Sequence, residues 1–265
     1  MDHSNDTTIL DIPNQAMTSF AIDDAIATAV GNEEVAPTVR IWVHDKTIVL
    51  GIPDSRLPYL DKGLEWIKTN NYQAVIRNSG GLAVALDKGV VNVSFIIPNI
   101  DKVSIHDGYD LMYHFIQQMF SHYTNEIKAY EIIGSYCPGD YDLSINGIKF
   151  AGISQRRVRN GIAVQIYIDV AGNSSERAMT VQKFYHVSKG TQITSYTYPD
   201  VNPQVMGTIS DLVQVPFTVR QVIDLVKSTL ASGHITIQED DLTANEEHVF
   251  YKRLQQMKKR NDKIT

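Results

Sequence analysis

Apolar residues recur at helical spacing in several parts of the chain. Phe20 to Val30 has apolar residues at three- and four-residue steps and stops at Gly31, which predicts an N-terminal helix. The stretch 109–123 repeats the same steps and predicts a long helix with one buried face. The sequence Thr243-Ala-Asn-Glu246 is a capping box that predicts a last helix through Met257. Three more helices are expected at 57–69, 177–187 and 219–230.

Strand-length apolar runs fill the middle of the chain. Two are expected at 40–43 and 47–52, paired around the polar turn His44-Asp45-Lys46. Runs at 73–76, 82–86 and 90–97 are separated by glycine turns and indicate the middle of a sheet. A hairpin is expected where Asn146-Gly147 joins 141–145 to 148–153, since both turn residues tolerate positive φ. The stretch 161–170 predicts a further strand.

This order of elements predicts an α+β fold with a mixed, mostly antiparallel central sheet flanked by helices. We expect residues 15–235 to form one main domain and 236–265 a helical C-terminal extension. The turn-rich stretch after Thr191 is a second place where a small C-terminal subdomain could begin.

The composition is typical of an intracellular enzyme. The chain has 265 residues, 43% hydrophobic and 20% charged, enough to bury a sizeable core. The first ten residues show no basic leader or apolar segment, and no run approaches the roughly 20 apolar residues of a membrane span. We therefore expect a cytoplasmic protein without a membrane partner.

Charge and cysteine content narrow the possible partners and cofactors. The net charge of −6 argues weakly against nucleic acid and favours small molecules or proteins as partners. The single cysteine cannot form an internal disulfide, and no Cys/His cluster has zinc-ligand spacing. No metal site is expected.

Cys137 lies in a segment of turn residues, between Gly134-Ser-Tyr136 and Pro138-Gly-Asp140. A lone cysteine is most often a small buried hydrophobe, whereas a loop is where reactive groups are commonly displayed. Both interpretations stay open on these residues alone. A thiol with the usual pKa of about 8.5 needs a positive neighbour to ionise near neutrality.

Lys149 is the candidate for that neighbour. It follows the Asn146-Gly147 turn by two residues and is flanked by Ile148 and Phe150, so it is expected to project opposite to them. Most lysines are simply solvated. An ammonium held beside a cleft would instead lower the pKa of a thiol, polarise an acyl carbonyl and shuttle a proton. A thiol and an ammonium this close in sequence suggest acyl transfer.

The segment Arg77-Asn-Ser-Gly-Gly81 is a glycine-rich turn between two predicted strands. It is compatible with an ordinary connection in which glycine supplies positive φ. It is also compatible with a site where a ligand approaches the backbone and exposed N–H groups hold a developing oxyanion.

These segments together resemble a known superfamily. The stretches Arg77 to Asp87, Val90 to Pro98 and Tyr141 to Gly152 with Gln155 are similar to the lipoate-protein ligases, octanoyltransferases and biotin ligases, over roughly residues 20–233. The segment from Gly134 through Cys137 to the later Gly-Ile-Ser-Gln-Arg-Arg resembles one branch, the amidotransferases that take octanoyl groups from the glycine cleavage H protein. The resemblance implies a lipoate/biotin ligase-like catalytic domain.

Two departures from the ligase pattern support this branch. Asn78, Leu82 and Leu86 replace an Arg, a Gly and a His of the ligases, which puts an adenylate-forming site in doubt. Cys137 precedes Lys149, whereas the transferases that use acyl carrier protein carry their cysteine after the lysine.

The resemblance implies a ping-pong reaction through a Cys137 thioester, with no ATP, metal or cofactor beyond the covalently carried octanoyl or lipoyl group. The donor would be the glycine cleavage H protein, and the acceptors would be lipoyl domains of 2-oxoacid dehydrogenase complexes. Cys137 and Lys149 match the catalytic pair. The other matched positions are expected in the acyl cleft, with two aspartates as likely to be structural: Arg77, Ser79, Gly80, Gly81, Gly152, Gln155, Asp87 and Asp142.

Three alternatives remain at this stage. The first is an octanoyltransferase that uses acyl carrier protein, the second an ATP-dependent lipoate ligase, and the third a non-catalytic protein that binds lipoyl domains. Cys137 and its context disfavour the last two. They separate the first alternative poorly, because donor choice depends on surface complementarity.

Overall fold

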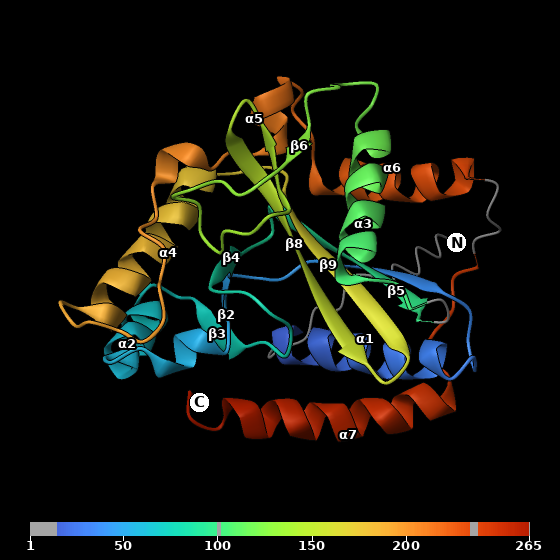
Figure 1. Cartoon of the computed structure of the whole chain (residues 1–265), viewed down its shortest axis with the longest axis horizontal. Coiled ribbons are helices and arrows are strands. Elements are labelled where there is room, and N and C mark those ends of the chain that lie inside the picture. The colour runs from blue at the N-terminus through green and yellow to red at the C-terminus, as the bar shows by residue number, and fades with distance from the viewer. Residues whose placement is uncertain (1–14, 100–101, 234–237, 265) are drawn as a thin grey trace, which may run out of the picture.

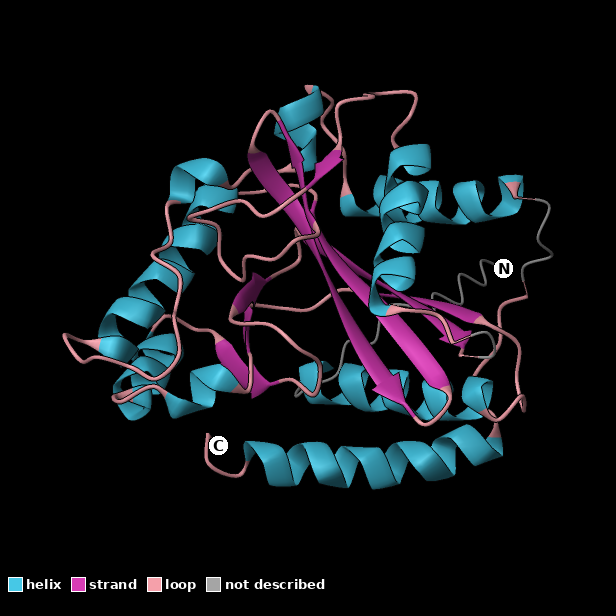
Figure 2. Cartoon of the chain, in the orientation of Figure 1, coloured by secondary structure: helices cyan, strands magenta, loops and turns pink. Residues whose placement is uncertain are grey.

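The computed structural model describes residues 15–99, 102–233 and 238–264, which contain two sheets (Figure 2). The larger sheet is antiparallel throughout. In spatial order its six strands are β1 (Thr38–Trp42), β5 (Val90–Pro98), β9 (Gly161–Asp169), β8 (Ile148–Val158), β7 (Asp142–Ile145) and β6 (Lys128–Ala129). The smaller sheet has the order β3 (Gln73–Ile76), β2 (Thr47–Leu50) and β4 (Val84–Leu86), with β2 and β3 parallel. The α+β class with mostly antiparallel strands is confirmed.

All the predicted helices are present in the described part of the chain. The α-helices are α1 (Gln15–Gly31), α2 (Leu60–Thr69), α3 (Ile105–Met119), α4 (Ser174–Lys189), α5 (Ile209–Val213), α6 (Val219–Ser232) and α7 (Ala244–Asn261). Short 3-10 turns lie at Pro53–Arg56 (η1) and Pro203–Val205 (η2). The capping box at Thr243 and Glu246 opens α7 as expected. None of the helices among the described residues combines the length and the apolar content that a membrane span needs.

Strand alternation gives the large sheet two different faces. Val93 and Ile166 belong to an apolar cluster that includes residues of α3 and α6. Their strand neighbours Asn92, Gln165 and Tyr167 therefore point to the opposite face. Helix α1 packs on strands of this sheet, and α7 lies along α1 (Figure 1). Helices α2 and α4 pack beside each other and against the small sheet.

The Asn146-Gly147 hairpin is confirmed. Both residues have positive φ, 51° and 79°, as a type I′ turn requires. The hairpin joins β7 to β8 and sets Ser144 opposite Lys149 in the strand register. A register shift between Leu143 and Ser144 bends β7 at this point.

Two expectations about strand pairing were wrong. Strands β1 and β2 do not pair around His44, because β1 pairs with β5 in the large sheet while β2 pairs with β3 and β4. The His44 ring is buried and stacks near Trp42, so this polar segment is a crossing between sheets. Of the three runs expected in the middle of a sheet, β5 is an interior strand of the large sheet, whereas β3 and β4 are the two edges of the small sheet. Local pattern finds a strand, but long-range packing selects its partner.

The C-terminal helix is tied to the edge of the small sheet. The side chain of Asn261 accepts a hydrogen bond of 2.7 Å from the N–H of Ile76 and donates one of 3.2 Å to its carbonyl oxygen. These bonds satisfy both backbone groups at the end of β3. The predicted domain boundary between residues 235 and 236 lies outside the residues that the structure describes and stays a prediction.

Candidate active site

A pocket of about 220 Å³ lies between the two sheets and contains Cys137 in its wall. The small sheet contributes Val49, Val84 and Leu86, and the polar face of the large sheet contributes Asn92, Gln165 and Tyr167. Two loops complete it with Arg77, Gly80 and Gly81 on one side and Cys137, Pro138 and Gly139 on the other. Segments 60 residues apart in sequence therefore meet at the cysteine.

The Cys137 thiol is half-buried and held by two donors. Sγ accepts a hydrogen bond of 3.2 Å from Nη2 of Arg77 and one of 3.1 Å from the backbone N–H of Leu82. The backbone of Cys137 has a φ of 46°, a left-handed conformation that costs energy for a non-glycine residue and is found preferentially at functional sites. This environment makes Cys137 the candidate nucleophile, although the residue also packs against the apolar core.

Lys149 differs from the expectation. Its ammonium is fully buried, and it donates to the backbone carbonyl oxygens of Tyr136 (2.9 Å) and Cys137 (3.1 Å). It also lies 3.2 Å from the Ser135 hydroxyl and 2.7 Å from a carboxylate oxygen of Asp142. The cation in contact with the sulfur is thus Arg77, whereas Lys149 contacts the main chain that carries the cysteine.

Asp142 and Lys149 form a buried ion pair beneath the cysteine loop. Asp142 lines the pocket and also accepts hydrogen bonds from the Ile132 N–H (3.1 Å) and the Ser135 hydroxyl (3.2 Å). Burial raises the pKa of Asp142, and the neighbouring Lys149 charge partly offsets this effect. The pair therefore braces residues 132–137 from inside the protein.

Arg77 has a donor to spare. It is buried, and its Nη2 also donates to the Leu82 carbonyl oxygen at 2.8 Å. Its Nε has no hydrogen-bond partner among the residues that the structure describes. In a guanidinium, Nε–H and one Nη2–H point the same way and form a fork. A second acceptor beside the sulfur would complete this fork.

Gly81 makes the close approach of Arg77 and Cys137 possible. It has a φ of 103°, and a Cβ at this position would lie 2.1 Å from Nη2 of Arg77 and 2.9 Å from Sγ. A Cβ at Gly80 would meet nothing within 4 Å. Of the two expected glycines, Gly81 is therefore the one that the site sterically requires.

The remaining predicted residues divide into pocket and support positions. Gly152 and Gln155 line the pocket, and a Cβ on Gly152 would lie 2.9 Å from the ring of Tyr167. Ser79 is buried but is not among the lining residues, and its hydroxyl has no partner in the described part of the chain.

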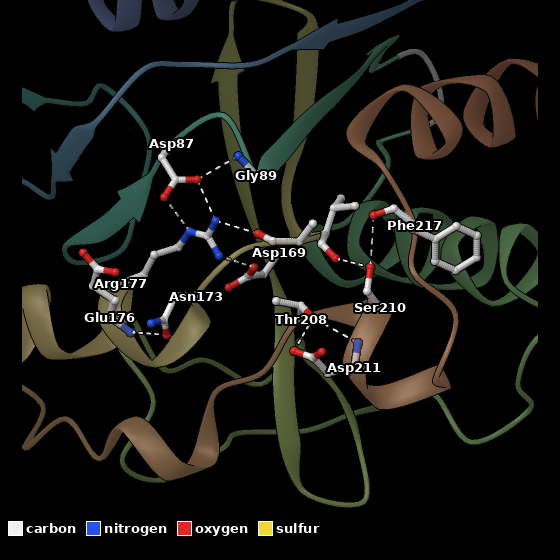
Figure 3. Close-up of polar contacts among 12 residues, drawn as sticks. Asp87, Gly89, Asp169, Asn173, Glu176, Arg177, Thr208, Ser210, Asp211 and Phe217 are labelled. Carbon is white, nitrogen blue, oxygen red and sulfur yellow. Dashed lines mark hydrogen bonds and ion pairs between the residues drawn. The ribbon is translucent and has the colours of Figure 1, made fainter.

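Asp87 belongs to a separate ionic cluster and not to the pocket wall (Figure 3). Its carboxylate accepts hydrogen bonds from Nε and Nη2 of Arg177 at 2.9 and 2.6 Å. It also accepts one from the N–H of Gly89 at 2.8 Å. Nη1 of Arg177 binds Asp169 at 2.6 Å. Burial raises the pKa of Asp169 to about 7, although Arg177 opposes this shift. Asp87 therefore does not line the pocket, and its carboxylate is bound by Arg177 and the Gly89 N–H.

Several pocket residues were missing from the sequence-based site: Phe20, Trp42, Asn92, Tyr109, Gln165 and Tyr167. One signal was available. Asn92 and Gln165 are polar residues inside otherwise apolar strand runs, and in a half-buried sheet such residues mark a face that is not ordinary core.

Comparisons with known proteins agree with this geometry. Residues 15–231 match the family model of the lipoyl protein ligase A/B catalytic domain. The chain is 58% identical over 262 residues to an octanoyl-[GcvH]:protein N-octanoyltransferase of Oceanobacillus iheyensis, covering 99% of this chain and 94% of the relative. It is 42% identical to a lipoyl-[GcvH]:protein N-lipoyltransferase of Listeria monocytogenes, covering 98% and 94%.

Solved structures show the same fold. A lipoate-protein ligase A bound with ATP superposes with a TM-score of 0.70 at 18% identity, covering 93% of this chain and 92% of the ligase. A putative lipoate protein ligase of T. acidophilum with bound lipoic acid gives a TM-score of 0.68 at 18% identity, covering 94% and 93%. The chain belongs to the lipoyl protein ligase A/B catalytic domain family, and its near relatives there are octanoyl- and lipoyl-[GcvH]:protein acyltransferases.

Proposed function

We propose that this chain is a protein N-acyltransferase that moves an octanoyl or lipoyl group from a lysine of the glycine cleavage H protein to a lysine of a lipoyl domain. The observation that carries the proposal is the Cys137 sulfur, exposed to the pocket and held by Arg77 and the Leu82 N–H. The names of the relatives supply the H protein as donor. The lipoyl-domain acceptor follows from the resemblance of the sequence to amidotransferases.

In the first half-reaction the Cys137 thiolate attacks the carbonyl carbon of the donor amide. A C–S bond forms, and the C=O π electrons move to the oxygen, which becomes an oxyanion. The Nε–H of Arg77, on the same guanidinium as the Nη2 that binds the sulfur, has no partner among the described residues and would be a donor for an oxygen on the attacked carbon. Arg77 would thus stabilise the thiolate and then the oxyanion.

Collapse of this intermediate breaks the C–N bond, and the donor lysine leaves as an amine after taking up the proton that the thiol released. The product is an acyl thioester on Cys137. An acceptor lysine amine then attacks the thioester, loses a proton and regenerates the thiolate. One amide replaces another, so the overall reaction is near energetic balance and needs no ATP.

The pocket suits an acyl chain of this kind. Its apolar walls come from Phe20, Trp42 and Val49 together with Val84 and Leu86. Each buried methylene contributes about 0.8 kcal/mol, so the six methylenes of an octanoyl group contribute about 5 kcal/mol. This energy would hold the acyl group while the two protein partners exchange.

The test is incubation with octanoyl-H protein in the absence of nucleotide. We expect intact mass spectrometry to show a gain of about 126 Da, the mass of an octanoyl group replacing a proton, on Cys137 as a thioester. A lipoyl domain added afterwards should remove this mass and acquire it. The Cys137→Ser protein is the control and should gain no mass under these conditions.

A donor comparison separates the alternatives. Octanoyl-H protein should acylate Cys137 faster than octanoyl-acyl carrier protein at equal concentration. A preference for the carrier protein would reassign the donor. Transfer that requires ATP and free octanoate would replace the amidotransferase with a ligase, and full-rate transfer by Cys137→Ser would remove the thioester mechanism.

A further inference from the structure

A chain of buried hydrogen bonds lies behind the cysteine, outside the pocket wall. The N–H of Ala83 donates to the Tyr185 hydroxyl at 3.0 Å, and this hydroxyl donates to the Asp54 carboxylate at 2.9 Å. The other Asp54 oxygen accepts the N–H of Gly51 at 2.7 Å. Tyr185 comes from α4 and Asp54 from η1, and neither lines the pocket.

This series of hydrogen bonds ends at the Leu82-Ala83 peptide group, which also contacts Arg77 beside Cys137. The Leu82 carbonyl and the Ala83 N–H belong to one planar peptide group. Its N–H is held by Tyr185 and its carbonyl oxygen by Nη2 of Arg77, at 2.8 Å. The same Nη2 and the preceding N–H, that of Leu82, both donate to Cys137 Sγ. Rotation of this peptide plane would therefore displace Nη2 of Arg77, and a shift of Leu82 as a whole would displace the N–H that also holds the sulfur.

The backbone of this segment makes few other hydrogen bonds, although the side chains of Leu82 and Ala83 are buried in the apolar core. Residues 82 and 83 precede β4, which begins at Val84, so they lack ladder hydrogen bonds to β2. Gly51 packs against the backbone of Gly81. A Cβ on Gly51 would lie 1.9 Å from the carbonyl oxygen of Gly81. Tyr185 therefore supplies the polar anchor where the sheet ends.

Burial of the Asp54 carboxylate costs desolvation free energy that an apolar side chain at this position would not cost. The carboxylate is fully buried, and burial raises its pKa to about 6, while hydrogen bonds from Gly51 and Tyr185 act in the opposite direction. No cation pairs with it within the described residues. The hydrogen bond by which Asp54 orients the Tyr185 hydroxyl is a reason to keep a carboxylate at this buried position.

We propose that Asp54 and Tyr185 are positioning residues for catalysis, which orient the Leu82-Ala83 peptide so that Arg77 and the Leu82 N–H hold the Cys137 thiolate. The inference rests on the proposed acyl-transfer function. Its test does not, because the state of the thiol is measured by alkylation without any acyl donor.

The first experiment compares Tyr185→Phe with Tyr198→Phe. Tyr198 is a matched control, since its ring lies 5.6 Å from that of Tyr185 and its hydroxyl donates to Pro53, the first residue of the turn that carries Asp54. Tyr198→Phe removes this bond without touching the Leu82-Ala83 peptide. Because Cys137 is the only cysteine, the rate of iodoacetamide modification against pH reports this thiol alone.

We expect Tyr185→Phe to slow alkylation of Cys137 at pH 7 by about tenfold, and Tyr198→Phe to leave the rate unchanged. The charged and titratable groups near the sulfur are Arg77, Tyr109, Tyr167 and Tyr185, with the Lys149–Asp142 pair beneath the main chain of the cysteine. In transfer assays Tyr185→Phe should lower kcat with little change in KM for the donor. An alkylation profile identical to that of the unaltered protein would overturn the proposal.

A second measurement needs no variant. In the unaltered protein the Ala83 amide should exchange its hydrogen slowly, because its acceptor is the buried Tyr185 hydroxyl. Exchange at the rate of an exposed loop would contradict the proposed anchor even if Tyr185→Phe failed to fold. Failure of acyl transfer by the unaltered protein, with both of these results as expected, would instead count against the proposed function alone.

Discussion

Nη2 of Arg77 lies 3.2 Å from Sγ of Cys137, although the two residues are 60 positions apart in the chain. The loop after β3 thus brings a permanent positive charge to the thiol on the loop before β7. Lys149 lies beneath the same cysteine and contacts its carbonyl oxygen. Arg77 therefore contacts the sulfur, whereas Lys149 contacts the main chain that carries it.

Removing the Arg77 charge should disable the thiol. We expect Arg77→Gln to slow alkylation of Cys137 at pH 7 by about tenfold, because the sulfur loses a positively charged hydrogen-bond donor. Acyl transfer should fall further, by about a hundredfold or more, because a donor for the oxyanion is lost as well. Arg220→Gln is the control, since Arg220 is exposed on α6. Equal alkylation by Arg77→Gln and the unaltered protein would refute the role of the guanidinium.

The two glycines of the Arg77 loop should respond very differently to alanine. Gly81→Ala places a methyl group 2.1 Å from Nη2 of Arg77 at a φ of 103°, so the guanidinium must leave the sulfur. We expect acyl transfer to fall at least a hundredfold. Gly80→Ala meets open space and should lose much less activity. Rate measurements on both proteins at equal folded fraction test this difference, and similar losses would contradict the steric explanation.

The variant Lys149→Ala distinguishes two roles for this lysine, ionisation of the Cys137 thiol and support of the Cys137 main chain. The sequence-based expectation is that Lys149→Ala slows thioester formation more at pH 7 than at pH 9, because high pH ionises the thiol without help. The contact with the Cys137 carbonyl instead predicts an equal loss at both pH values. Acylation rates of Cys137 at pH 7 and pH 9 decide between them.

Lys149 also matters for stability. Its loss leaves Asp142 buried without a cation, which should lower the free energy of unfolding by about 3–5 kcal/mol. The double variant Lys149→Met with Asp142→Asn should recover part of this loss, because no charge then remains buried. Urea denaturation of the unaltered protein, Lys149→Met, Asp142→Asn and the double variant measures the effect, and additive losses would show that the two side chains act independently.

The Asp169 carboxyl predicts how stability depends on pH. Its pKa is about 7 in the folded protein against 3.8 as the ordinary value, so the folded state binds this proton more tightly than the unfolded state. The contribution of Asp169 to the free energy of unfolding is full below about pH 4 and is lost as the pH rises to 7. In this range the free energy of unfolding falls by up to about 1.4 kcal/mol per pH unit. Asp54 should act in the same direction up to about pH 6.

The variant Asp169→Asn should flatten this dependence. An amide oxygen can still accept from Arg177, and the cation then faces only the Asp87 charge (Figure 3). Asp224→Asn, which changes an exposed residue of α6, serves as the control and should keep the slope of the unaltered protein. Melting curves between pH 5 and pH 8 provide the measurement. An unchanged slope in Asp169→Asn would assign the dependence to other groups.

Local sequence patterns predicted those features whose causes are local. The Asn146-Gly147 turn forms because both residues accept positive φ, and α7 begins at Thr243 because its side chain caps the first turn. Pairing of β1 with β5 in place of β2 was not predictable in this way. Two adjacent apolar runs satisfy the hairpin pattern equally well, and only the packing of the whole sheet selects the partner.

The sequence by itself determined which candidate groups the chain carries: one thiol on a turn-rich loop, a lysine just after a tight hairpin turn, and an arginine in the same loop as two glycines. The tertiary structure decided which cation touches the sulfur, that Asp87 binds Arg177, and that Tyr185 holds the Ala83 N–H. The physical reason is distance. A hydrogen bond requires about 3 Å between atoms, and only the folded sheets bring groups 60 to 100 residues apart within that reach.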